Sequence, residues 1–243
     1  MKSKTKIVRV FLAVMALFVI NACGQSDKST SETQEAETTA ADHKEEPAGN
    51  HKDHAAVALN AEESTVWKPS GEGVELIGRD FHFIAGNVDQ LNPVVMSEGG
   101  ENVLQLTTSG DQAAFVFHNK MGNVGIAITL KQDGYEGTLK IIHHAQNTDT
   151  YEFVSIKGNS MSQGRIVNGI EKVFDTKSFD STPGDWMTIR VSAAGTHYKG
   201  YLGDKNITHG HGDELDAGYI GIMTEGSGKV AIKSIEVTPL EAE

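Results

Sequence analysis

Two histidines and an aspartate stand two residues apart in the segment His209-Gly210-His211-Gly212-Asp213. In an extended strand, side chains at positions i, i+2 and i+4 point to the same side. Two imidazoles and a carboxylate with open coordination positions form an acceptable ligand set for a divalent transition metal. The interleaved glycines instead favour a mobile, solvent-exposed loop. Two hypotheses therefore remain for this segment: it binds a metal ion, or it is a solvent-exposed loop.

A second group of side chains has the chemistry of sugar recognition, in which aromatic faces stack on sugar rings and planar polar groups bind hydroxyls. In residues 186–192, strand alternation sends Met187, Ile189 and Val191 to the core and leaves Trp186 and Arg190 on the opposite face. The alternative for each candidate is that it lies on the surface or packs on the sheet without binding a ligand. The outward candidates are Trp186, Arg190, His197 and Tyr201, with Tyr151 and Arg165 expected nearby.

Other catalytic arrangements are poorly represented. Glu214 and Asp216 are spaced to share a strand face, but an acidic turn is the alternative. His143 and His144 are adjacent, so alternation points one ring inward and one outward, and we expect that they do not serve one site. The sequence has no Gly-x-Ser-x-Gly elbow for a nucleophilic serine, and its glycine-rich Gly226-Ser227-Gly228 has no following helix to bind phosphate. We assign no catalytic residues.

The elements that position these side chains are short runs with period-two alternation, separated by Gly, Asn, Asp and Pro. Because no stretch of ten or more residues shows helical periodicity, we expect almost no helix. The pattern predicts an all-β fold of two packed antiparallel sheets, a sandwich or jelly roll, forming one domain over residues 64–240. The expected strands are 74–77, 81–84, 103–106, 113–117, 124–130, 139–144, 151–157, 186–193, 197–202, 219–223 and 229–238.

The N-terminal region carries a targeting pattern. Four basic residues precede the apolar run of residues 10–22, which spans only about 20 Å as a helix and is too short to cross a bilayer. Ile20-Asn21-Ala22-Cys23 resembles a bacterial lipoprotein box. Residues 1–22 are therefore predicted to be a signal peptide and Cys23 the lipidated residue, with a free thiol as the alternative. The residue after Cys23 is Gly24, and not the aspartate that often retains lipoproteins at the inner membrane. This favours the outer membrane as the location.

Residues 23–63 are predicted to be a disordered acidic tether, because they contain no aromatic residue and many more acids than bases. His43, His51 and His54 lie in this tether and are either loose metal ligands or part of a solvated spacer. The whole chain has 243 residues, a net charge of −12 and one cysteine. This composition argues against nucleic-acid binding and excludes a disulfide framework. We expect a monomeric domain.

Four further stretches carry a resemblance to a known fold family: 141–156, Ile166-Val167-Asn168-Gly169, 184–191 and 217–224. Together they resemble the concanavalin A-like lectin/glucanase superfamily, and more narrowly its 3-keto-disaccharide hydrolase branch, over roughly residues 70–240. The resemblance implies a jelly roll and a carbohydrate ligand. Laminarinase-type members carry an E-x-D-x-x-E strand, and the predicted domain has no such run.

Three functional hypotheses follow. The first is an envelope lipoprotein that displays a β-sandwich for binding an oligosaccharide or polysaccharide. The second is a glycoside hydrolase of the 3-keto-disaccharide type, which the resemblance alone suggests. The third is a metal-binding envelope lipoprotein that uses His209, His211 and Asp213. Whether the chain is an enzyme stays open at this point, and a divalent metal is the one cofactor under consideration.

Overall fold

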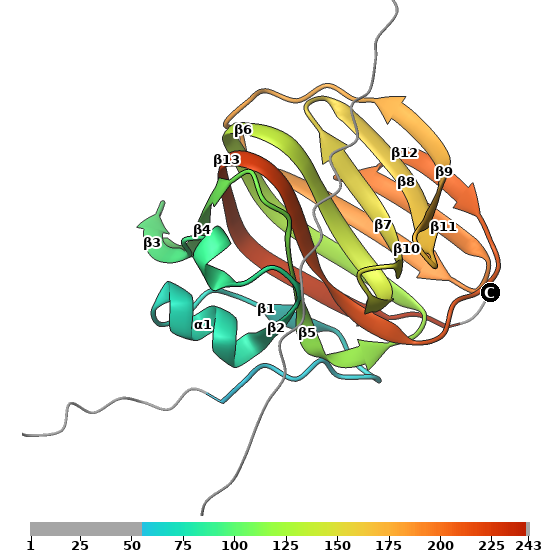
Figure 1. The fold of residues 1–243 in the computed structure, drawn as a ribbon, viewed down its shortest axis with the longest axis horizontal. Helices are drawn as coiled ribbons and strands as arrows, with labels where there is room; N and C mark the ends of the chain where they lie inside the picture. The colour runs from blue at the N-terminus through green and yellow to red at the C-terminus, as the bar shows by residue number, and fades with distance from the viewer. Residues whose placement is uncertain (1–54, 242–243) are drawn as a thin grey trace, which may run out of the picture. The chain divides into compact units, whose positions relative to one another are not determined.

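The computed structural model describes residues 55–241. The signal peptide, Cys23 and the tether histidines lie outside the described residues. In chain order the elements are β1 Thr65–Trp67, α1 Gly73–Asp80, β2 Phe81–Ala85, the 3-10 helix Val88–Gln90, β3 Val94–Glu98, β4 Glu101–Ser109, β5 Ala113–Met121, β6 Val124–Asn147, β7 Thr150–Lys157, β8 Ser160–Val167, β9 Ile170–Ser178, β10 Met187–Ala194, β11 His197–Leu202, β12 Lys205–His211 and β13 Gly218–Pro239 (Figure 1).

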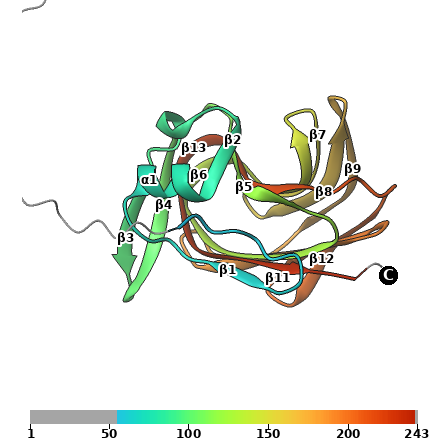
Figure 2. The ribbon, with the colours of Figure 1, turned by 90° about the horizontal axis from the view of Figure 1, so that it is seen from below.

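Two antiparallel layers form the fold, and the long strands β6 and β13 belong to both. In the first layer, which we call sheet I, β10 pairs with residues 124–130 of β6 and β1 with residues 235–237 of β13, in the order β12-β11-β10-β6-β13-β1. In the second, sheet II, the order is β9-β8-β7-β6-β13-β5-β2. Figure 2 shows the layers edge on, with β1, β11 and β12 in one and β5, β7 and β8 in the other. The predicted antiparallel sandwich is confirmed.

The crossing between the sheets lies where β6 and β13 bend together. The pattern predicted two strands at 124–130 and 139–144 and two more at 219–223 and 229–238, but each pair is one continuous strand. Gly137 and Gly226 face each other in the ladder, and a Cβ on either would collide with the other strand's backbone. Glycines let a strand pair bend sharply without losing its hydrogen bonds. The breaks in hydrophobicity therefore mark bends instead of chain reversals.

Residues 74–77 form part of helix α1, so the strand predicted there is wrong. The buried residues of α1 are Gly73, Leu76, Ile77 and Asp80, which follow the i, i+3, i+4, i+7 spacing of one helix face. A strand could not bury the adjacent Leu76 and Ile77 on one side. Among residues 55–241, no helix has the length and apolar character needed to cross a bilayer.

The folded domain begins before the predicted boundary at residue 64. Leu59 is buried, and its N–H donates to Asn119 Oδ1 at 3.2 Å. The N–H of Val57 donates to the fully buried Asp80, which also accepts from Trp67 Nε1 at 2.8 Å. Apolar residues at alternate positions 57 and 59 thus pack on the domain, although they lie in a segment whose overall composition is that of a tether.

Candidate functional site

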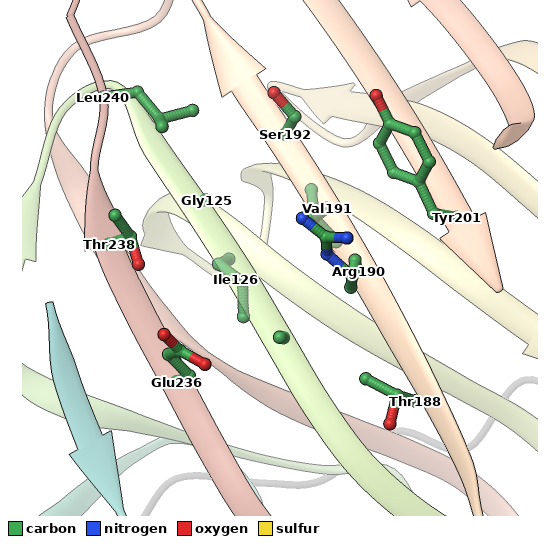
Figure 3. Close-up of a pocket in the computed structure, with 11 residues that line it drawn as sticks. Gly125, Ile126, Thr188, Arg190, Val191, Ser192, Tyr201, Glu236, Thr238 and Leu240 are labelled. Carbon is green, nitrogen blue, oxygen red and sulfur yellow. The ribbon is translucent and has the colours of Figure 1, made fainter. Parts of the chain in front are cut away.

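A groove of about 450 Å³ crosses the outer face of sheet I. Its floor is formed by the small residues Gly125 and Ala127 of β6, which alternate with core-facing Ile126. In Figure 3, β10 and β11 present Arg190 and Tyr201 on one side of this floor, and β13 presents Glu236 and Thr238 on the other. The remaining lining residues are Thr188, Val191, Ser192 and Leu240.

One wall of the groove combines an aromatic ring with a guanidinium. Arg190 and Tyr201 are direct cross-strand partners, and the guanidinium lies 5.8 Å from the centre of the Tyr201 ring. Arg190 also donates to Asp204 at 2.8 Å. Ile189 and Val191 are buried, so the prediction that alternation leaves Arg190 on the outer face is confirmed.

The other wall supplies acceptors. Glu236 is exposed, and its Oε1 accepts from Ser64 Oγ at 3.1 Å. Glu236 and Thr238 were not among the predicted site residues, although alternation places them opposite the buried Ile235 and Val237. The alternation of polar and apolar residues along β13 shows that these side chains point outward. It does not show that β13 pairs with β6, which is what places Glu236 across the floor from Arg190.

Trp186 immediately precedes β10 and lies outside the set of residues that line the groove. Its Nε1 donates to Glu98 Oε1 at 3.2 Å, and the ammonium groups of Lys131 and Lys233 lie 4.9 and 4.6 Å from its ring. The hydrogen bond from Lys131, followed by that from Trp186, lowers the pKa of Glu98. The indole is therefore engaged by protein groups instead of facing the groove.

The structure separates Tyr151 and Arg165 from the groove, so their predicted proximity is wrong. Tyr151 is buried in a small cluster of sheet II with Phe153 and Met223, and burial raises its pKa to about 12. Arg165 of β8 is buried, and its Nη2 contacts Tyr198 of β11 in sheet I. Both residues lie on sheet II, whereas the groove lies on sheet I. Which strands belong to which sheet depends on long-range pairing, which residue spacing does not show.

Arg165 belongs to a buried polar network between the sheets. Its Nη2 donates to Glu152 Oε1 at 2.6 Å, to the Tyr198 hydroxyl at 3.0 Å and to the backbone carbonyl of Asp213. His143 and His144 direct their Nδ1 atoms at the other Glu152 oxygen, at 3.5 and 3.2 Å. Although burial acts in the opposite direction, contacts with the histidines and Arg165 lower the pKa of Glu152.

The side chains of His143 and His144 contact each other, so the prediction that they point to opposite faces of the strand is wrong. Their Nδ1 atoms are 2.8 Å apart and both rings are buried. Between Ile142 and Ala145 the strand β6 carries one residue more than its partner β13, which forms a β-bulge. His144 there adopts a left-handed backbone with φ of 50°. The bulge turns both side chains to the same side.

His209 and His211 are also brought together, but with a different third residue than predicted. The structure groups them with His197 of β11, and all three side chains are exposed. Asp213 instead turns its backbone carbonyl toward Arg165 and Tyr198. Glu214 and Asp216 lie in the irregular segment between β12 and β13, so no strand alternation brings them to one face.

The sequence matches no protein-family profile and no curated protein. Solved structures with the same architecture do match. A carbohydrate-binding module of family 66 from Bacillus subtilis is 12% identical with a TM-score of 0.52, covering 64% of this chain and 94% of that one. A β-1,3-1,4-glucanase (lichenase) from a mouse hindgut metagenome is 10% identical with a TM-score of 0.52, covering 73% and 100%.

This chain has the concanavalin A-like jelly-roll fold. A further structure of this fold, a protein of unknown function from Shewanella oneidensis, is 12% identical with a TM-score of 0.56, covering 77% of this chain and 92% of that one. At such identities the likeness concerns the jelly roll alone, and the ligand has to be argued from the groove.

Proposed function

We propose that this chain recognises a neutral oligosaccharide in the groove of sheet I. The observation that carries the proposal is the pairing of a Tyr201–Arg190 wall with a Glu236–Thr238 wall across a floor of small residues. A tyrosine ring offers a face for stacking on a sugar, and a guanidinium and a carboxylate bind vicinal hydroxyls through directed hydrogen bonds. The volume of about 450 Å³ falls within the usual range for small-ligand sites.

The charge of the groove supports a neutral ligand. Its lining contains one cation, Arg190, and one anion, Glu236, which stand on opposite walls. An anionic sugar would meet the carboxylate, and a cationic sugar would meet the guanidinium. A carbohydrate-binding module shares this jelly roll, so the fold is compatible with sugar recognition.

Binding without cleavage is the expected activity. Hydrolysis by a carboxylate pair requires two carboxyl groups about 5 Å apart, or about 6.5–9.5 Å apart, around the scissile bond. Among the residues that line the groove, Glu236 is the one carboxylate. We therefore expect saccharide binding without release of new reducing ends, and sustained product formation by the groove would favour a hydrolase.

Removing either charged wall residue should weaken saccharide binding. A thermal-shift panel of neutral, acidic and 3-keto saccharides with the full chain identifies the ligand class, and calorimetry then measures Kd. A hydrogen bond to a charged group contributes about 1.5–3 kcal/mol, so Arg190→Ala and Glu236→Ala should each raise Kd at least about 10-fold. Lys199→Ala is the matched control, because Lys199 is a neighbouring cation on β11 outside the groove lining. Equal Kd values for the parent and both wall variants would reject the site.

We further propose that lipid on Cys23 anchors the domain to the bacterial envelope, at the outer membrane. This proposal is supported by the Ile20-Asn21-Ala22-Cys23 pattern and concerns residues outside those that the structure describes. Each buried CH₂ of an acyl chain contributes about 0.8 kcal/mol, so multiple chains hold a protein stably. The parent should fractionate with membranes and Cys23→Ser should be released. A membrane-bound Cys23→Ser protein, or an unmodified Cys23 by mass spectrometry, would contradict this proposal.

A further inference from the structure

Three histidines form a cluster on the last two strands of sheet I, β11 and β12. His197 and His211 are direct cross-strand partners on β11 and β12, and His209 stands two residues before His211. The ring centres of His211 lie 4.5 Å from those of both His197 and His209. One ligand nitrogen from each residue lies within 4.8 Å of the other two.

The backbone around this cluster is held in place. The glycines that follow His209 and His211 pack inward: a Cβ on Gly210 would collide with Phe174, and one on Gly212 would collide with the Arg165 guanidinium. Gly212 N–H donates to Thr196 O at 3.1 Å, and His209 N–H donates to Asp175 Oδ2 at 3.3 Å. The interleaved glycines thus serve close packing, which corrects the expectation of a mobile loop in this segment.

We propose that His197, His209 and His211 bind one divalent transition-metal ion. Imidazole suits Zn²⁺, Cu²⁺ and Ni²⁺, whereas Mg²⁺ and Ca²⁺ prefer oxygen ligands. Zinc–nitrogen bonds of about 2.0–2.1 Å in a tetrahedron require nitrogens roughly 3.3 Å apart, so the exposed rings need only small rotations to close on an ion. Solvent completes the coordination, because all three side chains are exposed.

The inner histidine pair is a weaker candidate for the same chemistry. His143, His144 and Glu152 also converge, but Arg165 already supplies a cation to Glu152 at 2.6 Å. Adding a divalent ion there would place excess positive charge in the core. The outer cluster of His197, His209 and His211 contains three imidazole donors and no cationic side chain among its ligands, and all three side chains are exposed. It is also separate from the groove, since His197 stands four residues along β11 from Tyr201.

The test is a Zn²⁺ titration of the full chain by calorimetry. Cys23→Ser and the substitution of His43, His51 and His54 by alanine remove the N-terminal donors from every sample. One equivalent of Zn²⁺ should bind with a rise in Tm, and Mg²⁺ should give neither signal. His197→Ala, His209→Ala and His211→Ala should each weaken Zn²⁺ binding at least about 10-fold, the lower bound for losing even an outer-sphere partner.

His118→Ala is the matched control, because His118 is an exposed histidine on β5 in sheet II. It should keep the parent affinity, and circular dichroism should show that every variant is folded. The electron paramagnetic resonance spectrum of bound Cu²⁺ should show coupling to several imidazole nitrogens in the parent and to fewer in His197→Ala. No saturable Zn²⁺ binding, or an unchanged affinity in His197→Ala, would overturn the proposal.

Discussion

Replacing Arg165 by methionine should destabilise the domain by about 3–5 kcal/mol, because it leaves the buried Glu152 carboxylate without its cation. Glu152 is 1% exposed, and Arg165 Nη2 donates to it at 2.6 Å. The same guanidinium contacts Tyr198 of the opposite sheet and the carbonyl of Asp213. This one substitution therefore leaves the buried charge of Glu152 unpaired and removes a hydrogen bond between the two sheets. Urea unfolding of the parent and Arg165→Met measures the difference.

Two variants distinguish this account from a general effect of losing an arginine. Arg190→Met removes an exposed arginine whose partner, Asp204, is also exposed, and it should change the unfolding free energy little. The double variant Glu152→Gln/Arg165→Met removes both buried charges, and it should recover much of the loss because apolar or neutral replacements of a buried pair are often tolerated. A double variant less stable than Arg165→Met would show that the charge pair is not the cause.

The domain should also lose stability steeply in acid. Burial lowers the pKa of His143 to about 3, against an ordinary value near 6.5; the neighbouring Glu152 carboxylate opposes this lowering, and His144 and Arg165 add to it. Between these two pH values the unfolded chain binds a proton that the native chain does not. Stability therefore falls as the pH is lowered through this window, by about 1 kcal/mol per pH unit from this residue. The lowered pKa of Glu152 adds a loss in the same direction as the pH falls below 4.5, the ordinary value of a glutamate carboxyl.

His143→Gln tests the assignment of this acid sensitivity. Glutamine keeps a polar side chain but does not titrate, so the variant should show a shallower fall of unfolding free energy between pH 6.5 and pH 4. His118→Gln replaces an exposed histidine on β5, and this variant should keep the parent slope. Parallel curves for the parent and His143→Gln would contradict a neutral, buried His143.

Local patterning predicted the parts of this fold in which one face of a strand is buried. Strands 186–193 and 197–202 were found because core and surface residues alternate there, and the same alternation placed Arg190 outward. Strands β8, β9 and β12 were missed, since polar residues interrupt their apolar pattern. Residues 74–77 of helix α1 were predicted to be a strand, because four residues are too few to distinguish the helical period of 3.6 residues from the strand period of two.

The site was predictable only where it depended on one strand. Arg190 and Tyr201 followed from alternation, whereas Glu236 required knowledge that β13 pairs with β6. The meeting of His197 with His209 and His211 likewise depends on the β11–β12 register. The convergence of His143 and His144 depends on a single inserted residue in β6. Pairing and bulges are long-range properties, so residue spacing alone does not reveal them.

We expect the saccharide to lie on the outer face of sheet I, between Arg190 and Glu236. Amide chemical-shift mapping of the full chain, titrated with the saccharide that the thermal-shift panel selects, tests the location directly. The shifted amides should cluster on the groove residues Gly125, Ala127, Ser192 and Thr238. Shifts that cluster instead around Lys140 and Tyr219 would place the ligand on sheet II and exclude the groove as the binding site.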